Sequence, residues 1–256
     1  MMPSIFVSHG APNLLLQDVP ARRFLRELGT TLPRPRAIVA VTAHWETRRP
    51  AVGAAPAPAT IHDFGKFDDR LFTMQYPAPG APELADRVSD LLCDAGVPST
   101  LDAARGLDHG IWVPLMLMYP LADVPVVPLS VQPSCGPGHH LQVGRALTAL
   151  RADGVLVLAS GSFTHDLGRF GSQMLDAQPP DDVDAFSTWF DDALTAGQTT
   201  ELLGYRTRAP HAALNHPTEE HLLPLFVALG AGGPTATRIH QSSTYVVLRM
   251  DAYAFS

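Results

Sequence analysis

The sequence predicts an α/β fold in which helices flank a central sheet that is mostly parallel or mixed. Strand-like apolar runs alternate along the chain with segments of helical periodicity, which is typical of parallel sheets. Three of these runs lead to a histidine: Ile5–Ser8 to His9, Ala37–Ala43 to His44, and Val155–Ala159, through a short loop, to His165. Because ligands of open α/β sheets bind beyond the carboxyl ends of strands, these histidines are expected to converge there. Converging histidines indicate a metal site.

Composition favours one domain that acts on a small molecule. The chain has 256 residues, of which 46% are hydrophobic, and no linker-like tract divides it, so we expect one domain over residues 1–256. The net charge of −7, without a basic stripe, argues against nucleic-acid binding. No apolar run approaches a membrane span and no signal peptide is visible, which predicts a cytoplasmic protein without membrane contacts. The sequence does not distinguish between a monomer and a homodimer.

Cysteine usage restricts the kind of metal site. Cys93 and Cys135 are far apart and lack Cys-x-x-Cys spacing, so they indicate neither a disulfide framework nor a thiolate zinc site. Any metal would be held by imidazole and carboxylate groups.

The expected strands are continuous apolar runs. The best example is Ala37–Glu46, whose β-branched residues suit a strand that is covered on both faces. The expected strands, in order, are Ser4–Ser8, Ala37–Glu46, Val126–Val131, Val155–Ala159 and Thr244–Asp251. The Pro/Ala-rich segment Ala51–Ala59 is expected to be a surface connection.

The expected helices are marked by their ends and their periodicity. Asp18 is the expected N-cap of a helix that reaches Leu28. Pro82 suits the first turn of a helix that continues to Ala95, where Gly96 ends it. The other expected helices are an apolar helix that follows Trp112 and runs through about Tyr119, then His139–Leu150, Val183–Ala196 and Thr218–Leu229.

The start of the last helix contains a further candidate ligand. Thr218 is expected to cap the helix, with Glu219 and Glu220 in its first turn, where the helix dipole favours negative charge. The same dipole disfavours a protonated imidazole, so His221 is expected to be neutral and free to bind a metal. Pro224 is expected beyond the first turn, where it would bend the helix.

Six other histidines are expected to have no catalytic role, because a lone histidine is more often a hydrogen-bonded surface or core residue. His139 and His140 are expected to be solvated. The others with an expected structural role are His62, His211, His216 and His240.

Six short motifs occur in order along the chain. They are Phe6–Pro12, Thr42–Glu46, Thr60–Phe64, Tyr76–Gly80, Leu107–Gly110 and His216–His221. No single motif is decisive, but the ordered set resembles the DODA-type extradiol ring-cleavage dioxygenases of the LigB-like class III superfamily. The resemblance extends from residue 5 to the 220s.

This resemblance implies a single α/β domain with a mononuclear metal centre. It implies His9, His44 and His221 as metal ligands, His165 as the acid/base and His109 beside the substrate. Protocatechuate-type relatives have a carboxylate where this chain has His221, so three neutral imidazoles would replace the two-histidine, one-carboxylate set.

The chemistry implied is the opening of a catechol-type ring by O2 beside the diol, which gives a muconic semialdehyde. Fe2+ would be the catalytic metal, although Zn2+ is expected in protein purified in air because zinc outranks Fe2+ in affinity. His165 would take a proton from a catechol hydroxyl and later return it, and an imidazole that titrates near neutrality suits both steps. Substrate choice is expected to depend on loops around His62, His109 and Phe170–Pro180.

Two other classes of function are open at this point. A zinc-dependent hydrolase could use the same histidines, although the chain lacks His-Glu-x-x-His and Gly-x-Ser-x-Gly motifs. A non-enzymatic binding protein is the second, because the Memo-type proteins resemble this superfamily in fold and fold does not determine function.

Overall fold

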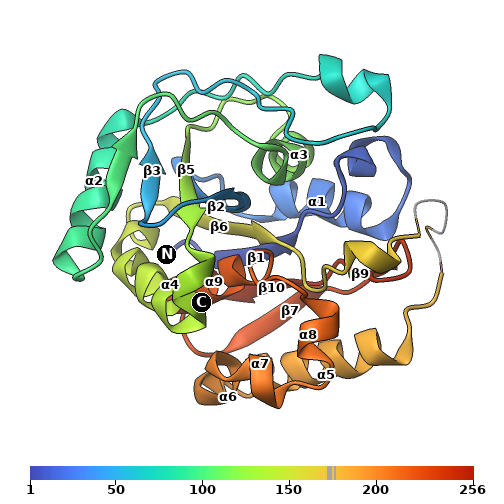
Figure 1. Cartoon of the computed structure of the whole chain (residues 1–256). Coiled ribbons are helices and arrows are strands. Elements are labelled where there is room, and N and C mark those ends of the chain that lie inside the picture. Colours follow the sequence, from blue (N-terminus) through green and yellow to red (C-terminus); the bar gives the residue numbers. More distant parts are fainter. Residues whose placement is uncertain (172–174, 176) are drawn as a thin grey trace.

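An eight-stranded mixed sheet runs through the centre of the computed structural model, which describes residues 1–171, 175 and 177–256 (Figure 1). The strand order is β4-β3-β5-β2-β6-β1-β10-β7. The four central strands, β5, β2, β6 and β1, are parallel, whereas β10 and β7 continue the sheet antiparallel to their neighbours. This architecture confirms the expected α/β domain. Strand bounds are β1 Ser4–Ser8, β2 Ala37–Glu46, β3 Ala51–Gly53, β4 Thr100–Asp102, β5 Val126–Val131, β6 Val155–Gly161, β7 Ala236–His240, β8 Ser243–Thr244, β9 Leu248–Arg249 and β10 Ala252–Phe255.

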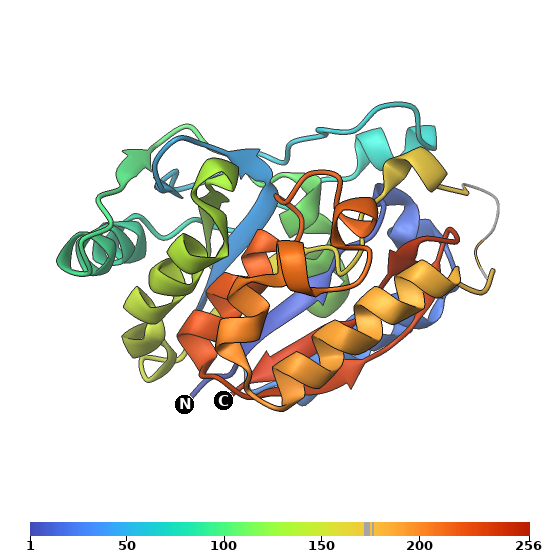
Figure 2. The ribbon, with the colours of Figure 1, turned by 60° about the horizontal axis from the view of Figure 1, so that its bottom comes forward.

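Helices cover both faces of the sheet. In β2, Val39 and Val41 enter the core cluster under α2, α4, α5 and α9, whereas Ile38 and Ala40 pack on the opposite face with α1 and α3. Figure 2 shows α4, α5 and α9 of this layer in front of the sheet. Burial on both faces explains the continuous apolar runs. Helix bounds are α1 Pro20–Thr31, α2 Pro82–Asp94, α3 His109–Met118, α4 Gly136–Ala146, α5 Asp181–Thr195, α6 Thr199–Leu203, α7 Tyr205–Arg208, α8 Ala212–Asn215 and α9 Leu223–Gly232. Among the described residues, no helix is long and apolar enough to cross a membrane.

The central strands follow the sequence prediction, and the peripheral ones do not. The bounds of β1, β2 and β5 are as predicted, and β6 continues two residues further, to Gly161. The segment Ala51–Ala59 is not a simple surface connection, because its first three residues form the buried strand β3. The strand predicted over Thr244–Asp251 is wrong. Tyr245 and Val246 have φ of 54° and 73°, so the chain reverses in a β8–β9 hairpin.

Two helix starts also differ from the prediction. Asp18 is not a cap, because α1 begins at Pro20 after Val19, and the Asp18 carboxylate pairs with Arg23 instead (2.6 Å). The helix expected over Thr218–Leu229 begins only at Leu223. Pro224 therefore lies in the first turn of α9, where a backbone N–H would have no intrahelical acceptor. Proline removes no helical hydrogen bond at this position, so there is no reason to expect a bend.

The helix expected to begin at His139 is shifted by a few residues. The helix expected over His139–Leu150 runs instead from Gly136 to Ala146, and a short 3₁₀ helix follows over Thr148–Arg151. Helix α2 begins at Pro82 as expected, and the C-terminal ends of α2 and α3 lie within one residue of those expected, but α3 begins earlier than expected, at His109.

Helices α4 and α9 cross with their backbones in contact. A Cβ atom on Gly144 would overlap the carbonyl oxygen of Val227, and one on Gly230 would overlap that of Leu141. Glycine at both positions therefore sets the position of α9, the helix that follows His221.

We expect Gly144→Ala to destabilise the protein by about 1–3 kcal/mol, because the added methyl group must push the two helices apart. Gly138→Ala in the same helix is the matched control, since its Cβ would meet open space. This control should change stability by no more than about 1 kcal/mol. Urea unfolding of both variants measures the difference, and equal stabilities would contradict the proposed helix contact.

Candidate active site

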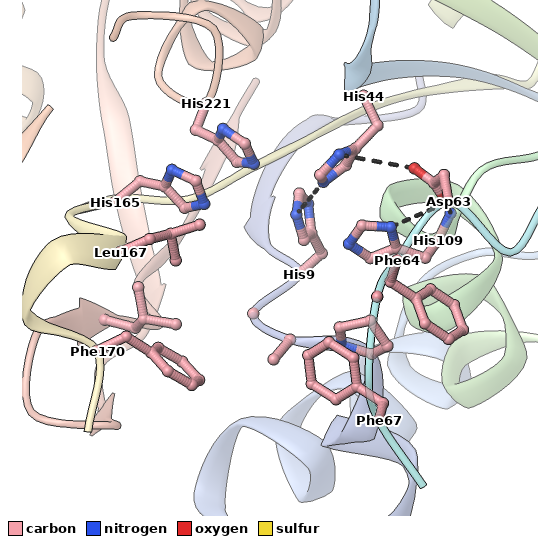
Figure 3. A pocket seen from close by; sticks show the side chains of 15 residues that line it. His9, His44, Asp63, Phe64, Phe67, His109, His165, Leu167, Phe170 and His221 are labelled. Carbon is pink, nitrogen blue, oxygen red and sulfur yellow. Dashed lines mark hydrogen bonds and ion pairs between the residues drawn. The ribbon is translucent and has the colours of Figure 1, made fainter. Parts of the chain in front are cut away.

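Five histidines from distant parts of the chain line one cavity of about 380 Å³ (Figure 3). Adjacent parallel strands β2, β6 and β1 end at the same edge of the sheet, which brings together the residues that end or follow them. The five are His9 after β1, His44 near the end of β2, His109 at the start of α3, His165 in the loop after β6 and His221 in the loop before α9.

His221 is positioned by the end of β6. The Ser162 N–H donates to the His221 carbonyl oxygen (2.9 Å), and a Cβ atom on Gly161 would overlap that same oxygen. The glycine therefore permits the close approach that carries His221 to the strand ends.

The imidazoles of His9, His44 and His221 point at one another. The Nε2 atoms of His9 and His44 are 3.0 Å apart, and one ring nitrogen from each of the three residues lies within 4.8 Å of the others. Two nitrogens bound at about 2.1 Å to one ion would be about 3.0 Å apart at a right angle. The spacing suits two ligands of a single metal ion.

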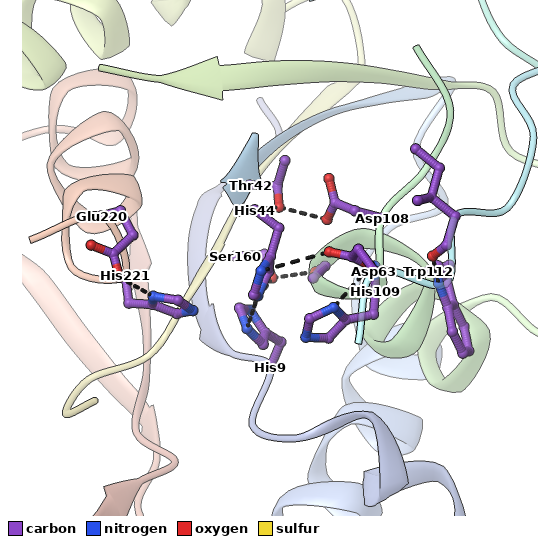
Figure 4. Close-up of polar contacts among 12 residues, drawn as sticks. His9, Thr42, His44, Asp63, Asp108, His109, Trp112, Ser160, Glu220 and His221 are labelled. Atoms are coloured by element: carbon purple, nitrogen blue, oxygen red, sulfur yellow. Dashed lines mark hydrogen bonds and ion pairs between the residues drawn. The ribbon is translucent and has the colours of Figure 1, made fainter. Parts of the chain in front are cut away.

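Hydrogen bonds on the far side of these rings determine their tautomers (Figure 4). Ser160 Oγ donates to the Gly110 carbonyl oxygen, so it accepts from His9 Nδ1 at 3.0 Å. The Glu220 carboxylate accepts from His221 Nδ1 at 2.8 Å. Each Nδ1 therefore carries the proton, which leaves a lone pair on each Nε2.

His44 is oriented in the same way, although its outer contact is longer. Its Nδ1 lies 3.7 Å from an Asp63 carboxylate oxygen, which favours the proton on that nitrogen.

Burial keeps these rings neutral. Burial first, and neighbouring imidazoles second, hold the pKa of His9 and of His221 well below the usual range and lower that of His44 to about 3. His221 is thus neutral as expected, but the cause is not a helix dipole, because the residue precedes α9.

Without a proton between them, converging lone pairs repel one another, and a cation would remove that repulsion. In addition, His221 Nε2 is buried and meets no hydrogen-bond partner among the described residues. This donor set fits a divalent metal ion, and the cluster indicates a possible metal site.

Two overlapping groups of side chains are less suited to a metal. They are His44, Asp63 and His109, and His165, Glu220 and His221. In each group the carboxylate already accepts an Nδ1 hydrogen bond, from His109 in the first and from His221 in the second.

Asp63 orients His109, a role that the sequence analysis missed. One carboxylate oxygen of Asp63 accepts from the His109 backbone N–H (2.9 Å) and from its Nδ1 (3.0 Å). Burial raises the pKa of Asp63, but the hydrogen bonds from His109 outweigh it and lower the pKa to about 2. The motif around Asp63 was recognised, but no spacing rule connects it with a residue 46 positions away.

Glu220, which orients His221, is the second residue that the sequence analysis missed, because the sequence indicated a helix start there.

His165 differs from expectation in its pKa. Its ring stacks on that of His221, with centroids 3.4 Å apart and planes 13° apart. Burial lowers its pKa to about 4, against the opposing charge of Glu220. The pKa of His165 therefore lies below the near-neutral range expected from the sequence, and the ring is neutral.

The prediction that His140 is exposed to solvent is wrong. This residue is fully buried, and its ring bonds the Gln132 N–H (3.0 Å) and the Gly136 carbonyl oxygen (2.7 Å) because the early start of α4 encloses it. His139 is half-buried and contacts Gln132. Ring hydrogen bonds support a structural role for His62 with Met74, for His216 with Phe163 and for His240 with Ser242.

Comparison with known proteins identifies the class. Residues 5–255 match the sequence profile described as the catalytic LigB subunit of aromatic ring-opening dioxygenase. The match places the chain in a class of aromatic ring-opening dioxygenases. The chain belongs to the LigB family.

Two relatives and one solved structure resemble nearly the whole chain. The chain is 42% identical over 259 residues to a 4,5-DOPA dioxygenase extradiol from Beta vulgaris, covering 99% of this chain and 96% of the relative. It is 44% identical over 234 residues to a protein of the same name from Escherichia coli (strain K12), covering 90% and 85%. The crystal structure of an uncharacterised protein from Escherichia coli K12 matches with a TM-score of 0.85 at 36% identity and covers 100% of both chains.

We expect Glu220→Ala to weaken metal binding about 10- to 100-fold, because the variant frees the His221 ring and removes a nearby negative charge. Glu220→Gln should lose less, since its amide oxygen can still accept from Nδ1. Zinc titration against a chelator measures both affinities, with the exposed Glu27→Ala as control. Unchanged affinity in Glu220→Ala would remove this carboxylate from the site.

Proposed function

We propose that this protein is an extradiol dioxygenase that opens a catechol-type ring beside its diol and yields a muconic semialdehyde. His9, His44 and His221 would hold Fe2+, His165 would act as acid/base, and His109 would contact the substrate. The observation that carries the proposal is the set of three neutral Nε2 lone pairs that converge in the cavity of a LigB-family chain.

A bound Fe2+ would supply the redox chemistry, because O2 in its ground state reacts slowly with a catechol and both can bind one open-sided metal. His9, His44 and His221 would hold the ion with three neutral nitrogens. Its divalent charge would then be available to stabilise a deprotonated catechol.

His165 would move the proton. Its neutral ring lines the cavity on the side of His221 and can accept a proton from a catechol hydroxyl at a ring nitrogen. The anionic substrate would then favour the protonated ring. The proton returns to the opened product, and both atoms of O2 enter that product, so atoms balance.

His109 would position the diol. In the neutral ring, Nδ1 donates to Asp63 and Nε2 is an acceptor, and the ring centroid lies 3.9 Å from that of His44. An acceptor next to the ligand cluster can receive a hydrogen bond from the second catechol hydroxyl. Asp63 would hold the ring in this tautomer.

The other function classes have less support. The family match supports an oxygenase rather than a zinc hydrolase, and relatives at over 40% identity carry a dioxygenase name. The converging imidazoles would have no evident use in a Memo-like binding protein.

Activity is expected to follow iron content. Zinc should occupy the site in protein purified in air, because it binds nitrogen ligands more tightly than Fe2+, and zinc cannot pass electrons. Anaerobic reconstitution with Fe2+, metal analysis and an oxygen electrode with a catechol measure the relation. Equal cleavage by zinc-loaded, iron-free protein would show that iron is not required.

Replacement of His165 should separate the acid/base from the ligands. His165→Gln is expected to retain iron while ring cleavage falls about 10²- to 10⁴-fold, because a positioned proton acceptor is lost. His9→Ala is the comparison variant and should lose iron as well as activity. Measurements of iron stoichiometry and of single-turnover ring cleavage distinguish the two roles. Near-normal cleavage would exclude a catalytic role for His165, and lost iron would make it a ligand.

A further inference from the structure

Asp108 precedes helix α3 but does not cap it. An aspartate at this position usually accepts a hydrogen bond from the free N–H groups of the first helical turn, which stabilises the helix. In the described structure the Asp108 side chain accepts no such bond, although its carbonyl oxygen accepts from Ile111 and Trp112 (both 2.9 Å). The side chain is also fully buried, where a carboxylate loses its hydration. A different contact must therefore account for its orientation.

The Asp108 carboxylate binds two side chains outside α3. One oxygen accepts from the Thr42 hydroxyl at 2.7 Å, and the other accepts from the Arg105 guanidinium at 2.5 Å. Figure 4 shows the carboxylate directed at Thr42, which belongs to strand β2. The guanidinium carbon of Arg105 lies 4.8 Å from the ring centroid of Trp45. Asp108 is thus paired in charge and joined to the strand that carries His44.

Thr42 extends this contact to the backbone of His44. The pairing of β2 with β6 ends at Thr42, and its pairing with β5 is interrupted between Val41 and Glu46, so His44 lies outside both ladders. The His44 N–H donates instead to the Thr42 hydroxyl oxygen (3.2 Å). The single hydrogen of that hydroxyl is donated to Asp108. Two hydrogen bonds therefore connect the Asp108 carboxylate with the backbone of a candidate metal ligand.

The first turn of α3 also lies directly against the histidine cluster. A Cβ atom on Gly110 would lie 2.9 Å from His44 Cδ2, which is closer than non-bonded carbon atoms approach. The Gly110 carbonyl oxygen accepts from Ser160 Oγ, which in turn accepts from His9 Nδ1 (3.0 Å). The same turn begins with His109, whose ring centroid lies 3.9 Å from that of His44. A shift of this turn would therefore disturb several histidines at once.

We infer that Asp108 is a positioning residue, which acts through the Thr42 hydroxyl to hold the candidate ligand His44 in register with His109. This inference rests on the proposed function, in which His44 binds the metal and His109 positions the diol. Asp63 already lies at the Nδ1 atoms of both rings, and Asp108 would hold their backbones. Because a buried ion pair contributes little net stability, alignment of the site explains this carboxylate better than folding does.

A purely structural link between α3 and β2 predicts a different result. It would lower the free energy of unfolding of any variant that breaks the link, and it would leave the metal affinity of the folded protein unchanged. Two substitutions of the fully buried Thr42 distinguish these interpretations. Thr42→Val retains the volume of the side chain and removes the hydroxyl, whereas Thr42→Ser retains the hydroxyl and removes a methyl group.

Thr42→Val should bind zinc about 10-fold more weakly than the wild-type protein, because the His44 backbone loses its hydrogen-bond partner. Thr42→Ser should bind zinc as tightly as the wild-type protein. Zinc titration against a chelator measures both affinities, and urea unfolding measures the stability of each variant separately. Ser187→Ala is the control, since it removes a buried hydroxyl of α5 that has no hydrogen-bond partner among the described residues. Equal zinc affinities of Thr42→Val and Thr42→Ser would overturn the inference.

A double variant tests whether Thr42 and Asp108 act through one contact. Asp108→Ala should weaken zinc binding at least as much as Thr42→Val does. If the two residues act in series, the addition of Thr42→Val to Asp108→Ala should lower the affinity no further. Losses that multiply in the double variant would show that the residues act independently, which would contradict the inference. Should Asp108→Ala fail to fold, the two Thr42 variants decide alone.

Turnover separates this inference from the proposed function. At saturating Fe2+, Thr42→Val should cleave a catechol with a lower kcat/KM than Thr42→Ser, because His109 is no longer aligned with His44. If the wild-type iron-loaded protein cleaved no catechol, the proposed function would fail, and the zinc affinities would still decide the role of Asp108. If it cleaved catechols while the two Thr42 variants bound zinc equally well, the inference would fail and the proposed function would stand.

Discussion

The site depends on one electrostatic constraint: three unprotonated imidazole nitrogens must face one another inside the protein. Their lone pairs repel unless a cation lies between them, so the scaffold has to hold them in place. Strands β1 and β2 hold His9 and His44 on either side of β6, and the Ser162 N–H, just after β6, donates to the His221 carbonyl oxygen. Burial prevents the rings from taking up protons, which would block the same lone pairs.

Two carboxylates lie next to the cluster of histidine rings, and each accepts a hydrogen bond from one of the rings. Glu220 holds His221, and Asp63 holds His109 and faces His44. These carboxylates would therefore balance the charge of a bound cation while their oxygens accept hydrogen bonds from the histidine rings, and apolar side chains line the part of the cavity away from the histidines. One cavity thus combines a polar end at the sheet edge with an apolar end built from loops.

The sequence was most informative where local composition determines structure. The bounds of β2 follow from its continuous apolar run, and the histidines at strand ends follow from the parallel order. It was misleading at Thr218, where a good cap and two glutamates precede a turn instead of a helix. It could not show the pairing of Asp63 with His109, because that contact exists only after the chain has folded. The metal and catalytic roles of the histidines stay proposals.

The wide sequence separation of the histidines has a consequence for folding. The three histidines that would bind a metal come from distant parts of the described chain, so a metal ion would gain its full set of ligands only when β1, β2 and the loop before α9 have all assembled. A metal ion would therefore bind late, after the strands and the loop have assembled, and would not nucleate folding. It would stabilise the whole domain through mass action, by about 2.7 kcal/mol when free metal is 100-fold above its dissociation constant.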